Sequence, residues 1–403
     1  MTQDTATRGG RISRRKFLVA AGAAGATGLA GCSGSSSNAN NDASGGSGGS
    51  EDSGGSGSNN DQSSSDDSGS SPQMLTAEGS STVYPIANKG SSYWNSNPPA
   101  SDGEYWGSSS EASVPGWDSL ADNGAEGMRL ADYFTSLYGF EPTGQQATPP
   151  FMTSIGLSHS GTGCKSVVDG LVDIGNSSGP ITAELDWSEE KAGEEVVDHV
   201  LGRDGQPVVV SSDIYDAGVT QLTGEQVRKI YQNEISNWSE VGGPDQDIYV
   251  IGRAEGSGTD TAFRLNMLGD ADASMSGVDT RFGQNQQVAQ SVQQNEGAIA
   301  YMALAFTSES VRPIGIEFDG TLYEPDRDAE NTIFDSAYPL NRDLHQYTKI
   351  TEDTPDGTDM REAAFMNMFL TDFGQKVFVE DNNYIPLPTS DIDSEFEKLP
   401  GQV

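Results

Sequence analysis

The sequence predicts an α/β fold with two lobes, carried by the chain that follows residue 72. After Met74, short aliphatic runs alternate with segments of helical periodicity, an order that is typical of α/β proteins. The chain has 403 residues, enough for about two to three domains. Three turns rich in Gly, Ser and Thr each stand between a strand-like run and a helical one.

The charge balance narrows the classes of partner. Lys and Arg number 22 against 60 Asp and Glu, a formal net charge of −38. Nucleic acids and anionic membrane surfaces favour basic patches, so neither is expected as a partner. The acidic surplus is typical of a protein adapted to high salt. Two cysteines exclude a disulfide framework, and the three histidines form no zinc-binding motif, so neither a metal nor another cofactor is expected.

Residues 1–31 predict an export signal. Arg14 and Arg15 precede a short apolar stretch, rich in Ala and Gly, that is too short for a membrane span. The arginine pair resembles a twin-arginine signal, and the four residues ending at Cys32 resemble a lipobox, in which the cysteine is lipidated. The alternative is an ordinary signal with an unrelated cysteine.

Residues 32–72 predict a disordered tether. Their Ser, Gly, Asn and Asp content cannot bury apolar surface. Forty such residues have an r.m.s. end-to-end distance of about 35 Å. A lipid at Cys32 would therefore hold the folded body, residues 73–403, away from a membrane.

Each of the three turns connects a strand-like run to a helical run. The turns are Gly79–Ile86 after Met74–Ala77, with Pro85 in the first helical turn; Ser158–Lys165 after Ile155–Leu157, with Val167, Val168, Leu171 and Val172 next; and Gly252–Thr259 after Ile248–Ile251, with Phe263, Leu265, Met267 and Leu268 next.

Such turns suit the binding of an anion. The first N–H groups of a helix lack partners, and small residues let an anion approach them closely. Three converging turns, with hydroxyl donors and the guanidinium fork of Arg253, would enclose a small tetrahedral oxyanion without a metal. Taken alone, each turn is better explained as an ordinary helix cap.

Two enzymatic interpretations of the second turn fail because required glycines are missing. Cys164 stands where a P-loop requires the glycine before its lysine. Ser158 and Thr162 stand where a hydrolase nucleophile elbow requires glycines around Ser160. The adjacent His159 is better explained as a structural histidine, since neighbours in sequence rarely adopt triad geometry. No enzyme is predicted; a phosphate-ester hydrolase is the weakest alternative.

A series of short motifs follows in fixed order: Gly79–Pro85, Ser160–Gly163, Asp173–Ser178, Leu222–Trp238, Gly252–Thr259, Gly297–Tyr301, Tyr338–Arg342 and Tyr384–Pro388. Together they cover most of residues 74–390 and resemble the phosphate-binding lipoproteins of phosphate ABC transporters, in the type II periplasmic-binding-protein group. The signal and the acidic charge resemble a haloarchaeal member.

The resemblance implies a two-lobed fold with two hinge crossovers. Lobe one would hold residues 74–200 and 304–400, and lobe two residues 201–303. The ligand would be inorganic phosphate, captured between the lobes and delivered to permease subunits by a monomer at the extracytoplasmic face of the cell membrane. Alternatives are a receptor for another oxyanion, such as sulfate or tungstate, and a sensory anion-binding protein.

The resemblance also assigns the ligand contacts. They come from all three turns, Arg253 gives the charged fork, and Glu255 would orient it. The implied ligand-binding residues are Ser81, Thr82, Val83, Ser160, Ser178, Arg253, Ser257, Gly258 and Thr259.

Two features depart from the family pattern. Ser178 stands where well-known members have an Asp that accepts the proton of hydrogen phosphate and so rejects sulfate. Asp204 or Asp173 would be substitutes for that acceptor. Residues 90–150 are longer than the family needs, and we expect an inserted surface loop that packs over the lobe. The alternative is that this loop binds a partner.

Two local patterns predict helices in the body. Thr223 and Gln226 form a capping box before an apolar helical face. The apolar spacing over residues 359–378 predicts one late helix.

Overall fold

The computed structural model describes residues 73–99 and 127–403. The predicted signal, Cys32, the tether and residues 100–126 of the expected loop lie outside the described residues. Within the described ranges, no helix is both long enough and apolar enough to cross a membrane.

The first lobe is built on a five-stranded mixed sheet. Its first three strands run parallel, and β13 pairs antiparallel with both β3 and β4. In spatial order the strands are β2 (Thr153–Leu157), β1 (Leu75–Gly79), β3 (Ile174–Ser177), β13 (Asn341–Lys349) and β4 (Val196–Gly205).

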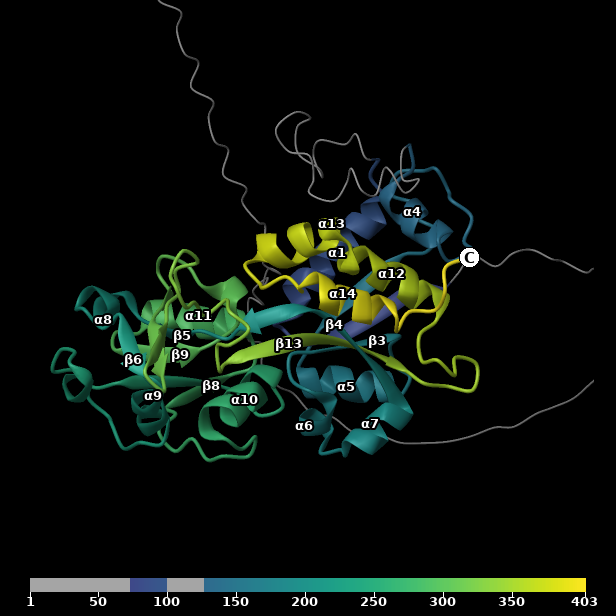
Figure 1. Ribbon diagram of the computed structural model, residues 1–403. Helices are drawn as coiled ribbons and strands as arrows, with labels where there is room; N and C mark the ends of the chain where they lie inside the picture. The colour runs from purple at the N-terminus through teal and green to yellow at the C-terminus, as the bar shows by residue number, and fades with distance from the viewer. Residues whose placement is uncertain (1–72, 100–126) are drawn as a thin grey trace, which may run out of the picture. The chain divides into compact units, whose positions relative to one another are not determined.

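Helices cover both faces of this sheet (Figure 1). One face carries α1 (Tyr84–Ser96), α4 (Leu130–Ser136), α12 (Met360–Leu370), α13 (Asp372–Gly374) and α14 (Thr389–Phe396), with the turns η5 (Gln375–Val379) and η6 (Glu380–Asn382) following α13 along the chain. The other face carries α5 (Ser160–Val168), α6 (Ile181–Leu185) and α7 (Glu189–Glu195).

The second lobe has a five-stranded mixed sheet and a three-stranded one. The larger has the order β10 (Arg312–Pro313), β5 (Val208–Val210), β9 (Ala298–Tyr301), β7 (Tyr249–Arg253) and β8 (Thr280–Phe282). The smaller has the order β12 (Thr321–Tyr323), β11 (Gly315–Phe318) and β6 (Gln221–Thr223).

The helical segments of the second lobe are α8 (Ser212–Asp216), α9 (Gly224–Tyr231), η2 (Trp238–Val241), α10 (Gly258–Phe263), η3 (Arg264–Leu268), α11 (Asn285–Gln294) and η4 (Leu304–Phe306). Successive residues of a strand face opposite sides of a sheet. Val209 accordingly packs with Val288 and Val292 of α11, while its neighbours Val208 and Val210 join the main hydrophobic core. Both faces of the larger sheet are therefore buried.

The chain crosses between the lobes twice, and the two crossings touch. The first runs from Gly205 at the end of β4 to Val208 at the start of β5. A Cβ atom at Gly205 would lie 1.8 Å from the carbonyl oxygen of Ile333 in the second crossing. Only glycine permits this approach.

The second crossing lies further along the chain than the sequence predicted. The boundary was expected between residues 303 and 304, but β10 pairs with β5, and β11 pairs with β6. Residues 312–323 therefore belong to lobe two, and the chain returns to lobe one only at β13. The first crossing likewise follows β4 rather than residue 200.

Of the two local helix predictions, one is confirmed and one is wrong. The Thr223 capping box is confirmed, with both reciprocal hydrogen bonds present. The late helix predicted over 359–378 is wrong as a single element, because α12 ends at Leu370 and new turns follow Thr371. The helix after the second turn ends at Val168, which leaves Leu171 73% exposed.

The expectation of a surface loop over residues 90–150 is wrong at both ends of that range. Gly90 and Trp94 lie within α1, and Leu130 and Phe134 of α4 are fully buried. Trp94 packs edge-on against Phe365 of α12, and its indole N–H donates to the carbonyl of Phe151 at 2.9 Å. These segments close the core of lobe one.

Replacing Trp94 with Ala should lower the free energy of unfolding by about 3–5 kcal/mol, because the truncation leaves a large cavity and an unpaired carbonyl. Denaturant unfolding followed by circular dichroism measures the change. Leu171→Ala, at an exposed position, is the matched control and should change stability by less than about 0.5 kcal/mol. Equal stability of the two variants would place α1 outside the core.

Candidate functional site

The predicted turns meet at one edge of the first sheet. Strands β1, β2 and β3 are parallel, with Gly79 opposite both Leu157 and Asn176. The segments that follow these strands therefore emerge side by side, and they carry Ser80–Val83, Ser160 and Ser178. The turn after β7, in lobe two, faces them.

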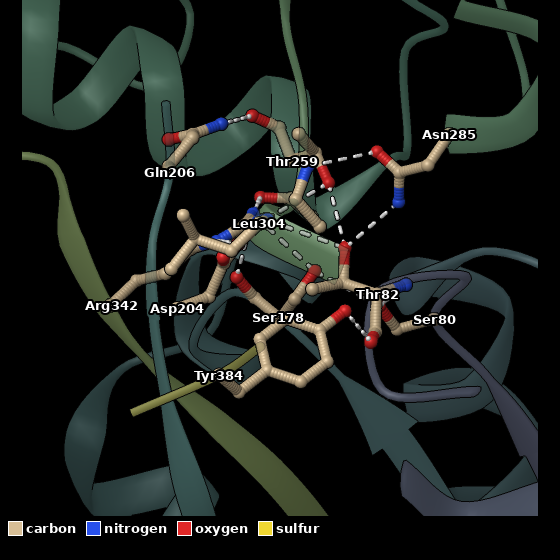
Figure 2. Close-up of polar contacts among 12 residues, drawn as sticks. Ser80, Thr82, Ser178, Asp204, Gln206, Thr259, Asn285, Leu304, Arg342 and Tyr384 are labelled. Carbon is tan, nitrogen blue, oxygen red and sulfur yellow. Dashed lines mark hydrogen bonds and ion pairs between the residues drawn. The ribbon is translucent and has the colours of Figure 1, made fainter. Parts of the chain in front are cut away.

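Hydroxyl groups of the two lobes contact one another directly across the boundary between the lobes, which we call the seam. Thr82 Oγ1 and Thr259 Oγ1 lie 3.0 Å apart. The amide of Asn285 donates to Thr82 Oγ1 at 3.2 Å (Figure 2). It also donates to Ser81 Oγ at 3.0 Å. Ser81, Thr82 and Thr259 are all buried. The first and third predicted turns thus form one buried polar cluster.

Ser160 and Ser178 form the lobe-one side of the same cluster. Ser160 Oγ accepts from the backbone N–H of Ser178 at 3.1 Å, and Ser80 Oγ donates to Ser178 Oγ at 2.9 Å. A Cβ atom at Gly258 would lie 2.3 Å from Ser160 Oγ and 2.8 Å from Ser178 Oγ. Glycine at 258 therefore lets the lobe-two backbone rest on these two serines.

Val83 and Ser257 occupy equivalent positions in the two lobes. Val83 is the residue before α1, with Pro85 in the first helical turn as predicted, and Ser257 is the residue before α10. Both are buried. Eight of the nine predicted ligand-binding residues thus lie at this seam, and the ninth, Arg253, lies beside it.

Arg253 is a buried cation without a carboxylate partner. It ends β7 and is 1% exposed. Its guanidinium donates to neutral oxygens: Phe282 O (3.2 Å), Asn285 Oδ1 (2.7 Å), Gly283 O (2.6 Å) and Ser81 Oγ (3.2 Å). Burial lowers the pKa of Arg253 to about 10, so the side chain keeps its charge at neutral pH. Among the described residues, no Asp or Glu forms an ion pair with it.

The prediction that Glu255 orients Arg253 is wrong in this structure. Glu255 is exposed, and no hydrogen bond or ion pair between described residues joins it to the guanidinium. Asn285 at the start of α11 takes that role, since its side-chain oxygen accepts from Arg253 and its amide donates to Ser81 and Thr82.

Arg342 is a second buried arginine at the seam, and it has a partner. Arg342 and Asp204 are opposite each other in the β13–β4 pairing, and Nη2 of Arg342 donates to Asp204 Oδ2 at 2.6 Å. The same guanidinium donates to Thr82 Oγ1 of lobe one at 3.3 Å and to Thr259 Oγ1 of lobe two at 3.2 Å (Figure 2). It also donates to the carbonyl of Gly258 in lobe two at 3.1 Å. The pair therefore fastens both lobes beside the first crossing.

The two carboxylates considered as substitute proton acceptors lie in different places. Asp204 is fully buried at the seam, with Oδ1 accepting from the Leu304 N–H at 2.9 Å and Oδ2 held by Arg342. Asp173 precedes β3, at the opposite end of that strand from the seam, and binds Thr76 and Arg361. Of the two, only Asp204 is placed near the cluster.

Sequence reasoning assigned no role to Asn285, Arg342, Gln206 or Tyr384. Arg342 and Tyr384 stood within motifs that carried the resemblance, and Tyr384 donates to the carbonyl of Thr82 at 2.6 Å. Gln206, in the first crossing, donates to the carbonyl of Thr259 at 2.7 Å. Asn285 follows a strand and opens a helix, which is the pattern of the three turns and was an available signal.

The second turn does not bring Ser160 and His159 together as a nucleophile and base. No hydrogen bond between described residues joins them, and His159 instead lies against Gly283 of lobe two. Burial, with Arg253 nearby, lowers the pKa of His159. Within the described ranges, no group of three or more His, Cys, Asp or Glu residues is arranged to hold a metal ion.

A family model for the PBP superfamily domain matches residues 142–372 of the chain. A solved structure from Clostridium perfringens, described as a phosphate ABC transporter substrate-binding protein with bound phosphate, aligns with a TM-score of 0.53. The alignment covers 78% of this chain and 100% of the other at 20% identity. Fold and site thus define a two-lobed binding protein of the type II periplasmic-binding-protein class.

Two relatives identify the family within that class. The phosphate-binding protein PstS of Bacillus subtilis is 31% identical over 231 residues, which are 57% of this chain and 69% of the relative. That of Staphylococcus saprophyticus is 28% identical over 254 residues, 61% of this chain and 75% of the relative. The chain belongs to the PstS family of phosphate-binding proteins.

Asp204→Asn should cost about 3–5 kcal/mol of unfolding free energy, because it leaves the buried guanidinium of Arg342 uncompensated. The double variant Asp204→Asn/Arg342→Gln should cost less than the sum of the two single changes. Denaturant unfolding of the four proteins gives the coupling free energy of the cycle. Additive costs would show that the two side chains act independently.

Proposed function

We propose that this chain is the phosphate-binding receptor of a phosphate ABC transporter. It captures inorganic phosphate between its lobes and delivers it to permease subunits, and catalyses nothing itself. The observation that carries the proposal is the buried, unpaired guanidinium of Arg253 beside a cluster of hydroxyl groups. Membership of the PstS family supports the choice of ligand.

An anion would complete the environment of Arg253. A buried charge without a partner costs several kcal/mol, and a charge-assisted hydrogen bond to an oxyanion offsets that cost. Hydroxyl groups of Ser81, Thr82 and Thr259, which now bond to one another or to nearby amides, would turn toward the ligand. We propose Ser160, Ser178, Val83, Ser257 and Gly258 as further ligand contacts.

Closure of the lobes would couple binding to recognition by the permease. Ligand contacts come from both lobes, so a bound anion favours the closed arrangement by bonds that the separated lobes cannot make. Arg342 adds its own bonds to both lobes at the crossing. We propose the closed form as the state that the permease reads.

We further propose that the protein is exported by a twin-arginine signal, held by a lipid at Cys32, and adapted to high salt. These proposals rest on the sequence of residues 1–72 and on the net charge of −38. A receptor for sulfate or another oxyanion is the second candidate, because Ser178 is a hydroxyl and Asp204 is already engaged by Arg342.

Calorimetric titration of the full chain in molar KCl should give phosphate binding and a much weaker response to sulfate. The reason is that hydrogen phosphate can donate its proton to an acceptor at the seam, whereas sulfate has no proton to give. Phosphate binding without a sulfate response would support the receptor and an acceptor other than an Asp at position 178. Equal or stronger binding of sulfate would favour the second candidate.

Arg253→Gln should weaken phosphate binding by at least about tenfold, because a hydrogen bond to a charged group contributes about 1.5–3 kcal/mol. Without phosphate, its unfolding free energy should stay within about 1 kcal/mol of the parent, since the change also removes an uncompensated buried charge. Arg312→Gln, at the edge strand β10, is the matched control. Unchanged affinity of the Arg253 variant would overturn this site.

A further inference from the structure

Glu184 is a partly buried residue at the seam, and the proposed phosphate site does not use its carboxylate. It lies in α6 of lobe one. Both of its carboxylate oxygens are shielded from solvent and have no hydrogen-bond partner among the described residues. Thr261 of lobe two lines the same cavity, but its hydroxyl donates to the carbonyl of Ser257 at 3.3 Å.

Two glycines of lobe one make room for this carboxylate. A Cβ atom at Gly179 would lie 2.7 Å from Glu184 Oε1, and one at Gly161 would lie 3.3 Å from Oε2. The carboxylate therefore lies between the start of α5 and the turn after Ser178, beside two ligand-binding segments. Neither glycine offers a side chain to pair with it.

Lobe two completes the burial. Glu184 lines a cavity of about 300 Å³ whose other walls include Gly256, Asp260, Thr261 and Arg264 of lobe two. The backbone N–H of Gly161 donates to the carbonyl of Gly256 across the same seam at 3.4 Å. Separation of the lobes would remove these walls and return the carboxylate to water.

The charged and titratable groups around Glu184 do not supply a free cation. They are Cys164 of α5, Arg342 and His345 of β13, Asp260 of α10, and Glu255, Arg264 and Asp272 at the cavity. Arg342 is held by Asp204, Arg264 by Asp260, and His345 by Asp198. An ionised Glu184 is thus buried without a partner of its own.

We propose that Glu184 determines phosphate affinity through its proton: closure of the lobes on phosphate buries this carboxyl in its neutral form and takes up one proton. The inference rests on the proposed phosphate-binding function and on closure between the lobes. Its physical basis is that a carboxylate which loses water without gaining a cation is protonated instead.

The pKa of Glu184 gives the direction and range of the effect. Burial raises this pKa from 4.5 to about 7, although the nearby Thr261 hydroxyl and the positive charge of Arg342 act to lower it. A group with a higher pKa in the closed state favours closure at low pH. That contribution is lost as pH rises from the open-state value, near 4.5, to the closed-state value of about 7, and nothing remains to be lost above it.

Calorimetric titration of the full chain with inorganic phosphate, in two buffers of different ionisation enthalpy, counts the protons taken up. At pH 6 the parent should take up close to one proton more than Glu184→Gln, and at pH 8.5 the difference should vanish. Because the titration of phosphate itself is common to both proteins, the difference reports Glu184 alone.

Affinities give a second readout. The ratio of the parent Kd to the Glu184→Gln Kd should rise with pH by up to about tenfold per unit below pH 7 and level off above it. Glu184→Met, a neutral side chain of similar length, should behave like the Gln variant. Asp272→Asn, an exposed carboxylate on the same cavity, is the matched control and should keep the parent proton count.

The outcomes separate this inference from the function on which it rests. If parent and both Glu184 variants bind phosphate with equal proton counts at pH 6, the inference is overturned and the receptor stands. If Asp272→Asn loses the extra proton as well, the uptake belongs to the cavity as a whole and the assignment to Glu184 is wrong. If the parent binds no phosphate at any pH, the proposed function fails first.

Discussion

The uncompensated guanidinium of Arg253 is the constraint around which the seam between the lobes is organised. A buried guanidinium needs oxygen acceptors for its N–H groups, and here neutral groups of two lobes accept four hydrogen bonds from it. Those neutral groups satisfy the hydrogen bonds of the guanidinium without cancelling its charge. The protein therefore keeps a local positive site within a chain whose net charge is −38. Distant acidic groups are screened at high salt, while this charge acts at contact range.

The comparison between Arg253 and Arg342 shows how one seam serves two purposes. Both guanidinium groups are buried and both reach hydroxyls from the first turn. Arg342 is neutralised by Asp204, directly opposite in the sheet, so its bonds hold the lobes together without creating a demand for an anion. Arg253 has no such partner, and that difference separates a structural arginine from one that is suited to a ligand.

The three turns could be predicted from the sequence, but the side chains that surround them could not. Ser81, Ser160 and Thr259 were placed by a local pattern of strand, small residues and helix, and local patterns survive folding. Glu255 was assigned to Arg253 by the family resemblance, but in the structure Glu255 is exposed while Arg253 is buried. Distances between segments depend on sheet register, which composition does not encode.

The same limit explains the misplaced boundaries in the fold. Strands β10 and β11 follow the first apparent return to lobe one, yet they pair with β5 and β6, far earlier in the chain. Trp94 stood in the range 90–150, where the length beyond the family pattern predicted an inserted loop, while its own indole packs in the core. In both cases the deciding partner lies far away in sequence.

The protonation of Glu184 likewise depends on residues that lie far from it in sequence. Nothing in its own segment distinguishes it from the many other acidic residues of the chain. Its character comes from glycines at 161 and 179, which leave room but no partner, and from lobe two, which excludes water. Arg253 stays charged because neutral oxygens satisfy its donors and its intrinsic pKa is far above neutral. Glu184 has neither advantage. A seam that holds one unpaired cation and one unpaired acid can therefore take up an anion on the first and a proton near the second, and both events depend on the same closure of the lobes.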